Sequence, residues 1–231
     1  MAQNKQVFLV DDHPLVREWL TNLINKRPDL QVCGEAGSAP EALQKIGELE
    51  PDIAIVDITL ASGSGIELIK DIQNNHPGVP VLVLTMHDET VYALRALRAG
   101  ARGYIMKSEA TKKVIEAIRT VVAGKLYVSD KVTALMAEKF AEHTPRQGGS
   151  PIELLSDREL EVFQLLGRGL GTRQIAEQLH ISFKTVQAFS ARIKDKLQLD
   201  NINELLREAI RWQESQQVNN EGKLQTSKSR V

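Results

Sequence analysis

The chain has 231 residues, 42% of them hydrophobic and 26% charged, and its formal net charge at pH 7 is -1. This length predicts one or two domains, and the composition excludes a disordered, collagen-like or repeat-dominated chain. No apolar run approaches the about 20 residues that span a bilayer, and we expect no signal segment before the first strand-like run. Together with the single cysteine, Cys33, these features predict a cytoplasmic protein without membrane contact.

The first half of the chain alternates short β-branched runs with amphipathic helical stretches. Residues 53–56 and 81–84 are continuously apolar, which is typical of strands buried on both faces of a parallel sheet. The pattern predicts an α/β doubly wound domain with a five-stranded parallel sheet, in which ligands bind at the carboxyl ends of the strands. The predicted strand and helix pairs are 6–10 with 14–26, 30–34 with 40–49, 53–56 with 65–75, 81–84 with 89–99, and 103–106 with 110–124.

The second half contains only helical patterns. A helical stretch covers 126–143, residues 144–151 have the Pro, Gly and Ser content of a linker, and helices separated by short breaks fill 156–213. The last residues lack periodic hydrophobic positions, which predicts a disordered polar tail. The expected organisation is an α/β domain over 1–124, a helical linker over 125–150, a small all-α four-helix domain over 151–213, and the tail over 214–231.

Polar side chains follow the predicted strands where each strand ends. Asp11 and Asp12 follow the first, Asp57 the third, Thr85 the fourth and Lys107 the fifth. Three carboxylates close together repel one another, and a hard divalent cation with oxygen ligands would keep them ionised. Mg2+ is the predicted ion. Because Mg2+ prefers few carboxylates together with a phosphate oxygen, the pattern predicts phosphoryl chemistry. Asp57 is the predicted nucleophile, Lys107 offsets charge on the phosphoryl oxygens, and the Thr85 hydroxyl donates to one of them.

A single Asp after a strand is more often a helix cap or a turn residue, so the combination of these residues carries the prediction. With their neighbours they resemble the receiver domain of two-component response regulators over residues 6–124. The matching motifs are Val10-Asp11-Asp12-His13, Val56-Asp57-Ile58, Leu84-Thr85-Met86 and Gly103-Tyr104-Ile105-Met106-Lys107-Ser108.

The resemblance implies a flavodoxin-like receiver in which Asp57 takes a phosphoryl group from a histidine kinase and Thr85 and Tyr104 move on phosphorylation. It implies that the protein is not an enzyme, and that its only reactions are the self-phosphorylation and slow dephosphorylation of Asp57. The sequence departs from the family pattern at Ala61, where proline is usual, and we expect a more flexible loop there. The Mg2+ ligands that the resemblance implies are Asp11, Asp12, Asp57 and the backbone carbonyl of Thr59.

Residues 156–213 have the layout of a helix-turn-helix, with two short helices joined by a tight turn and a supporting helix before them. Ser156 with Glu159 forms a capping-box pattern, and Thr172 and Ser182 are the predicted caps of the next two helices. Residues 151–213 contain 9 Lys and Arg and 9 Asp and Glu, so bulk charge provides no long-range attraction to nucleic acid. The predicted buried stripe of the third helix is Val186, Phe189, Ile193 and Leu197.

The motifs of this region look like the LuxR-type DNA-binding domain, and residues 6–213 as a whole are similar to the NarL/FixJ subfamily of response regulators. The motifs are Leu155-Ser156-Asp157-Arg158-Glu159-Leu160-Glu161-Val162, Gly169-Leu170, Ile175-Ala176-Glu177-Gln178-Leu179, Ile181-Ser182, Lys184-Thr185-Val186 and Lys196-Leu197. The resemblance implies a transcription regulator that forms a homodimer on activation and places its third helix in the major groove of double-stranded DNA, with RNA polymerase as a further partner.

The residues implied for DNA binding are Lys184, Thr185, Gln187, Ala188, Ala191, Arg192 and Lys194. Those implied for dimerisation are Ile202, Leu205, Leu206, Ala209 and Ile210, a stripe that can also pack inside its own domain. Family members typically carry lysine and histidine where this chain has Gln187, Ala188 and Phe189. We therefore expect modest, salt-sensitive affinity, with Gln187 reading adenine and Ala188 contacting a thymine methyl.

Two other classes of protein fit part of the pattern. A carboxylate-nucleophile phosphohydrolase would also use Asp57, Thr85, Lys107 and Mg2+, but it needs a second acid-base Asp two residues after the nucleophile, and that position is Thr59. A signalling adaptor would keep the receiver and bind protein through the helical domain, which its neutral charge permits. Enrichment of a specific operator would argue against the adaptor.

Overall fold

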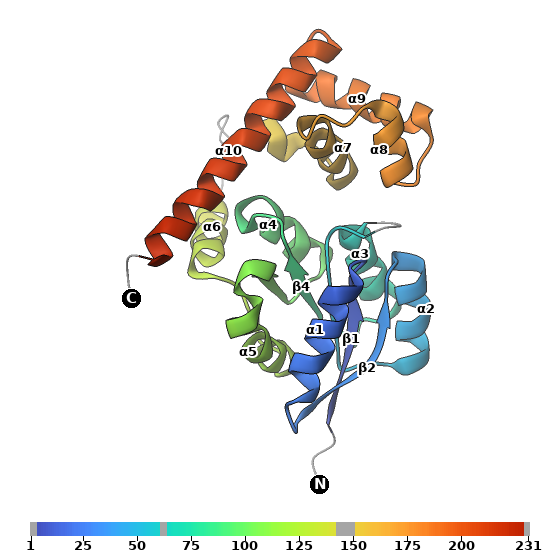
Figure 1. The fold of residues 1–231 in the computed structure, drawn as a ribbon, viewed down its shortest axis with the longest axis vertical. Coiled ribbons are helices and arrows are strands. Elements are labelled where there is room, and N and C mark those ends of the chain that lie inside the picture. The colour runs from blue at the N-terminus through green and yellow to red at the C-terminus, as the bar shows by residue number, and fades with distance from the viewer. Residues whose placement is uncertain (1–3, 61–63, 142–150, 229–231) are drawn as a thin grey trace. The chain divides into compact units, whose positions relative to one another are not determined.

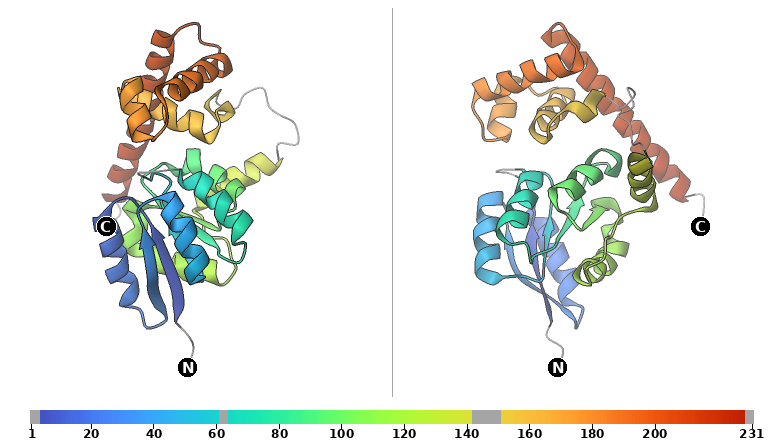
Figure 2. Two further views of the ribbon diagram at one scale, coloured as in Figure 1. Left: turned by 90° about the vertical axis from the view of Figure 1, so that its right-hand side faces the viewer. Right: turned by 180° about the vertical axis from the view of Figure 1, so that it is seen from behind.

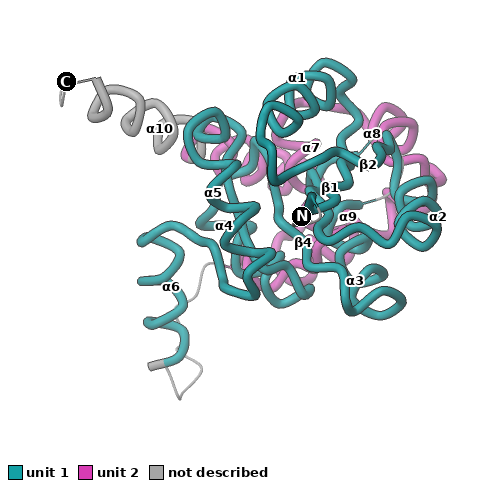
Figure 3. Tube along the Cα trace, turned by 90° about the horizontal axis from the view of Figure 1, so that it is seen from below, with its two compact units in different colours: residues 1–143 teal, residues 144–231 magenta. Residues whose placement is uncertain are grey.

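The structure is a computed structural model that describes residues 4–60, 64–141 and 151–228. The chain forms two compact units, Met1–His143 and Thr144–Val231 (Figure 3). Ala61 and the predicted linker residues 144–150 lie outside the described residues. Over the residues that are described, none of the helices combines the length and apolar character needed to cross a membrane.

Unit 1 contains one five-stranded parallel sheet in the order β2-β1-β3-β4-β5, which confirms the predicted doubly wound α/β fold (Figure 1). Strand order reverses between β1 and β3, and this is where such folds place their ligand sites. The strands are β1 (Lys5–Val10), β2 (Leu30–Ala36), β3 (Ile53–Val56), β4 (Val81–Thr85) and β5 (Gly103–Met106). The helices between and after them are α1 (Pro14–Asn25), α2 (Ala39–Leu49), α3 (Gly65–Asn75), α4 (Glu89–Ala99) and α5 (Ala110–Val122).

Helices cover both faces of this sheet (Figure 2). On one face, Leu20 and Ile24 of α1 share a core with Val114 and Ile118 of α5 and with the strand residues between them. On the other face, α2 packs beside α3, and α3 beside α4. The apolar strand runs are buried throughout, as β3 and β4 show, so only the loops at the strand ends remain for polar chemistry.

The helix predicted over 126–143 begins later, at α6 (Asp130–Ala141). The residues before it pair with the sheet edge instead. Tyr127 donates its N–H to the Arg102 carbonyl (3.0 Å), and its own carbonyl accepts from the Tyr104 N–H (2.9 Å). The edge of β5 is therefore covered by the segment that follows α5, which satisfies backbone groups that an edge strand leaves unpaired.

Unit 2 is all-helical, which confirms the predicted small four-helix domain. Its helices are a 3-10 turn η2 (Pro151–Leu154), α7 (Asp157–Gly167), α8 (Thr172–Gln178), α9 (Phe183–Leu197) and α10 (Ile202–Lys228). The predicted capping box is present, since Ser156 Oγ accepts from the Glu159 N–H and Glu159 Oε2 accepts from the Ser156 N–H. Ser182 caps α9 by accepting from the Thr185 N–H at 3.1 Å.

Two predictions about where the helices of unit 2 begin and end are wrong. Gly171 rather than Thr172 is the N-cap of α8, because the Gln174 side chain reaches back to accept the Gly171 N–H (2.8 Å). The tail predicted from residue 214 as disordered is helical through Lys228, as part of α10. That segment contains no proline and several Gln, Glu and Lys residues, which extend a helix whose first turns already pack on α7.

We expect the Gly167→Ala variant to lose stability in unit 2. A Cβ atom at Gly167 would lie 2.5 Å from the Ala209 carbonyl oxygen of α10, so α7 and α10 would have to move apart, at a cost of about 1–3 kcal/mol. Urea unfolding of the full chain measures this. Gly171→Ala is the matched control, because its nearest neighbour would be at 3.6 Å. Equal stability of the two variants would contradict the close approach of α7 and α10.

Candidate functional site

The strand order brings the predicted acidic residues of unit 1 together. Asp11 follows β1 and Asp57 follows β3, and these strands are neighbours at the point of reversal. The Lys107 ammonium, which follows β5, lies 2.6 Å from Asp57 Oδ2 and 2.6 Å from Asp11 Oδ2. Both carboxylates are buried, with side chains 4% exposed. The predicted nucleophile and the predicted cation are therefore in direct contact.

The charges in this pocket depend on one another. Burial raises the pKa of Asp57, and the Lys107 ammonium and the Thr85 hydroxyl offset only part of that rise. Burial alone would lower the pKa of Lys107, but Asp57 and Asp11 together raise it. Lys107 thus stays protonated between two carboxylates, and a further positive charge would favour the ionised form of Asp57.

Asp12 completes a cluster of groups that could hold a metal ion. Ligand atoms of Asp11, Asp12, His13 and Asp57 all lie within 4.8 Å of one another. Asp12 Oδ1 is buried and accepts no hydrogen bond, although His13 Nδ1 lies 2.7 Å away. Three carboxylates this close together fit a hard cation such as Mg2+, which prefers oxygen to nitrogen ligands.

The residues predicted to move are buried beside this pocket. Thr85 is fully buried at the end of β4, and Tyr104 on β5 is 3% exposed. The Tyr104 hydroxyl donates to the His87 carbonyl (3.0 Å), and burial raises the pKa of this hydroxyl well above its usual range. Tyr104 therefore points inward as a neutral donor and is held by the loop that follows Thr85.

His87 is a residue of this pocket that the sequence analysis did not select. Its Nε2 lies 2.8 Å from Thr59 Oγ1, while the Thr59 N–H donates to Asp57 Oδ1 at 3.3 Å. His87 also contacts the Tyr92 ring, with ring centroids 4.5 Å apart. It connects the loop after Asp57 to the loop after Thr85. Its place two residues after Thr85 was the one available signal, and that spacing alone names no contact.

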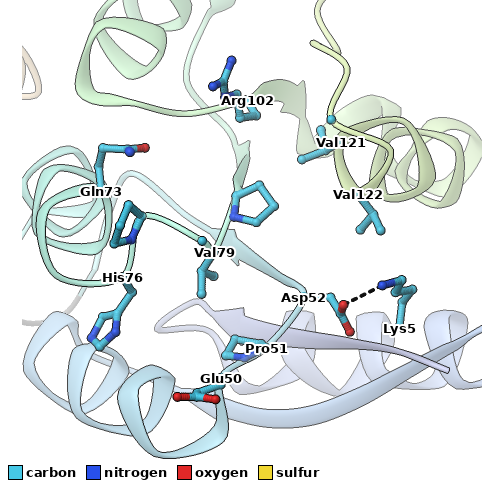
Figure 4. Close-up of a pocket in the computed structure, with 14 residues that line it drawn as sticks. Lys5, Glu50, Pro51, Asp52, Gln73, His76, Val79, Arg102, Val121 and Val122 are labelled. Carbon is cyan, nitrogen blue, oxygen red and sulfur yellow. Dashed lines mark hydrogen bonds and ion pairs between the residues drawn. The ribbon is translucent and has the colours of Figure 1, made fainter. Parts of the chain in front are cut away.

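A separate hollow of about 690 Å³ lies at the amino ends of the strands (Figure 4). Gln73 and His76 line it from the end of α3, and Val121 comes from α5. Lys5 and Asp52 form an ion pair of 2.7 Å across its rim. None of its lining residues belongs to the acidic pocket, so the two places are separate.

In unit 2, α9 presents most of the predicted DNA-binding residues to solvent. Thr185 and Lys194 are half-buried, and the exposed ones are Lys184, Gln187, Ala188, Ala191 and Arg192. The predicted buried stripe is partly wrong, because Ser190 is buried whereas Phe189 and Leu197 are half-buried. Ser190 fits the interior because its hydroxyl donates to the Val186 carbonyl at 3.0 Å.

Lys196 on α9 has a structural role. Its ammonium lies 2.6 Å from Oε2 of Glu159, which is buried, and also donates to the Leu154 carbonyl at 3.1 Å. Burial opposes ionisation of Glu159, but the hydrogen bonds from Lys196 and Ser156 lower its pKa overall. This ion pair links α9 to α7. Because the Lys196 ammonium is already paired with Glu159, we do not count it among the cations that could bind a ligand.

The predicted dimerisation stripe on α10 divides into two sets. Leu205 and Ala209 are fully buried inside unit 2, so the prediction that they face a partner is wrong. Ile202 and Ile210 are 46% and 42% exposed, and Leu206 between them is half-buried. Spacing of four residues places these three on one side of the helix, and they remain available for a partner.

Comparisons with known proteins agree with both units. Residues 7–119 match the response regulator receiver domain family, and residues 153–209 match the luxR family of bacterial regulatory proteins. The oxygen regulatory protein NreC of Staphylococcus carnosus is 35% identical over 210 residues, which is 89% of this chain and 97% of NreC.

Solved structures extend the similarity. A LuxR-family two-component response regulator from Aurantimonas sp. SI85-9A1 is 37% identical with a TM-score of 0.56, over 61% of this chain and 100% of that one. RcsB of Salmonella enterica serovar Typhimurium, bound to the promoter P1flhDC with the phosphomimetic BeF3-, is 26% identical with a TM-score of 0.63, over 90% and 98% of the two chains. With a receiver unit and a LuxR-type helical unit in this order, the chain belongs to the two-component response regulators of the NarL/FixJ subfamily.

Proposed function

We propose that this response regulator is controlled by phosphorylation of Asp57, and that phosphorylation switches its dimerisation and its sequence-specific binding to DNA in the cytoplasm. The observation that carries the proposal is the contact of buried Asp57 with Lys107 beside Asp11 and Asp12. RcsB, a relative of the same subfamily, has been seen bound to promoter DNA with a phosphomimetic, which supports the link between the two activities.

Asp57 is the proposed acceptor for a phosphoryl group carried by a histidine kinase. An Asp57 carboxylate oxygen attacks phosphorus, the phosphorus–nitrogen bond of the phosphohistidine breaks, and its electron pair leaves on the imidazole, which takes a proton from water. The Lys107 ammonium, 2.6 Å from Asp57 Oδ2, then faces the negative charge of the incoming group. The buried Thr85 hydroxyl at the end of β4 is placed to donate to a phosphoryl oxygen.

Asp11, Asp12 and Asp57, with the Thr59 carbonyl, are the proposed ligands of Mg2+. When bound, the ion supplies positive charge to the phosphoryl oxygens. Without it, Asp11 and Asp57 share the ammonium of Lys107, and burial raises the pKa of Asp57. Binding a cation that neutralises the cluster is therefore expected to precede or accompany efficient transfer.

The signal has a short route from Asp57 to the linker. Thr85 and Tyr104 lie next to the pocket, and the Tyr104 backbone N–H donates to Tyr127 just before α6. Ser129 Oγ donates to Glu89 Oε2 at the start of α4 (2.7 Å), and α6 packs on α4. A shift of α4 or β5 on phosphorylation therefore changes contacts made by the linker itself.

Unit 2 is the proposed DNA reader, with α9 as the helix that enters the major groove. Its exposed side offers Gln187 for paired hydrogen bonds to adenine and Ala188 for contact with a thymine methyl group. Lys184 at the start of α9 provides a contact to phosphate. We propose a regulator and not a turnover enzyme, because the position of the second acid-base Asp of phosphohydrolases is Thr59.

We expect Asp57→Asn to abolish labelling by a phosphodonor while the fold remains, because the amide cannot form the acyl phosphate. Incubation with radiolabelled acetyl phosphate and Mg2+ measures the label, and removal of Mg2+ with EDTA should greatly reduce it for the wild type. Asp12→Asn is the matched control for charge and should retain slow labelling. Persistent label on the Asp57→Asn variant would identify another acceptor.

Activation is expected to convert the monomer to a dimer through the exposed side of α10. Light-scattering mass of the full chain, with and without beryllofluoride plus Mg2+, should double on activation. Ile202→Glu with Ile210→Glu should weaken the dimer, because charges replace two exposed apolar side chains. Asn203→Glu, an exposed neighbour on the same helix, is the control. An unchanged mass on activation would contradict the proposed switch in dimerisation.

The two ends of the α9 surface should behave differently. Gln187→Ala should relax the preference for one base, with a loss of about 1–3 kcal/mol in discrimination between bases. Lys184→Ala should weaken binding to all DNA sequences alike. It should also reduce the salt slope, which is the slope of log binding constant against log salt concentration, by about 1. Selection of genomic fragments by the activated protein, followed by binding titrations, tests both. Unchanged footprints and affinities for both variants would move the DNA surface away from α9.

A further inference from the structure

Arg192, one of the residues implied for DNA binding, pairs with the aromatic ring of Phe189 on α9, and the function proposed so far gives this pair no specific task. The Arg192 guanidinium carbon lies 5.9 Å from the centroid of the Phe189 ring, within the range of a cation–π contact. The two residues stand three positions apart, and helical side chains lean toward the N-terminus of the helix. The Arg192 side chain therefore runs back over the ring, which is half-buried.

The guanidinium of Arg192 keeps its hydrogen-bonding groups available. Arg192 is exposed, and among the described residues its ring contact with Phe189 is its one recorded interaction. Asp195, three residues further on, is also exposed and forms no ion pair with it. The guanidinium therefore lies near the ring on an exposed residue, and within the described part of the chain its five N–H donors have no recorded protein partner.

The neighbours of Arg192 on the exposed side of α9 are small. Ala188 and Ala191 are both exposed, and neither side chain extends beyond a methyl group. A helix with such a surface can approach the floor of the major groove closely. A long side chain from the middle of the helix then reaches the base edges and not only the phosphates that flank the groove.

We propose that Arg192 reads a guanine in each half-site through O6 and N7, and that Phe189 is a positioning residue that presets the guanidinium for this contact. The inference rests on the proposed DNA-binding function of α9. Arginine suits the task because its planar fork matches the two guanine acceptors, which the ammonium of lysine does not. Holding the fork against the ring before binding reduces the rotamer freedom that is lost on binding.

The test uses the full chain activated with beryllofluoride and Mg2+, and a library of random DNA duplexes. The motif selected by the wild type is compared with that of Arg192→Lys, an exposed change that keeps the charge and does not threaten the fold. We expect this variant to lose preference for one G·C pair per half-site by about tenfold, with the salt slope unchanged. Arg168→Lys, the same change at an exposed arginine of unit 2 outside α9, is the control and should keep the wild-type motif.

Phe189 is tested by Phe189→Leu and Phe189→Tyr. Leucine keeps an apolar side chain without a ring, so discrimination at the same G·C pair should fall by about three-fold, while affinity for unrelated DNA stays the same. Tyrosine retains the ring face and should restore the discrimination. A merely structural role of Phe189 would instead lower the midpoint of thermal unfolding and the affinity for all sequences together.

The outcomes separate this inference from the function on which it rests. Selection of no motif by the activated wild type would overturn both. A wild-type motif that Arg192→Lys retains would overturn only the guanine contact. A uniform loss across all sequences in Arg192→Ala would assign Arg192 to phosphate and overturn it as well. Equal base discrimination by Phe189→Leu and the wild type would overturn the positioning role of Phe189.

Discussion

The contact of Lys107 with two buried carboxylates is the interaction on which the rest of unit 1 depends. It joins the ends of β1, β3 and β5, since the ammonium lies 2.6 Å from Asp11 and 2.6 Å from Asp57. Without it, two carboxylates would face each other in a place that water hardly reaches, and both would favour protonation. The charge that keeps the pocket stable is therefore the same charge that an incoming phosphoryl group would meet.

A pocket with this charge balance responds to any change at Asp57. A phosphoryl group on Asp57, as proposed, would draw on Lys107 and Thr85, and Thr85 ends β4 just before the loop whose His87 carbonyl accepts from the Tyr104 hydroxyl. Tyr104 in turn bonds through its backbone to Tyr127, where the linker begins. The path from Asp57 to the linker thus consists of packed and hydrogen-bonded neighbours within unit 1, which is what a local charge switch requires.

The parts of the structure that the sequence predicted are those set by local pattern. The five strands follow from apolar runs, and the acidic pocket from polar residues at strand ends, because parallel topology alone brings Asp11, Asp57 and Lys107 to one edge. The parts it missed depend on contacts between distant segments. Tyr127 replaces the first turns of a predicted helix by pairing with β5, and Leu205 on α10 is buried against its own domain.

The equal numbers of basic and acidic residues over 151–213, 9 of each, support the proposal that dimerisation and DNA binding are controlled together. With Lys196 bound to buried Glu159, few cations of α9 remain to neutralise phosphates, so one copy gains little from the salt-dependent part of binding. Two copies joined through α10 would bind adjacent half-sites as one ligand, with a high effective concentration for the second contact. Under the proposed function, weak attraction per copy would make occupancy of the DNA site depend on the dimer, and hence on the state of Asp57.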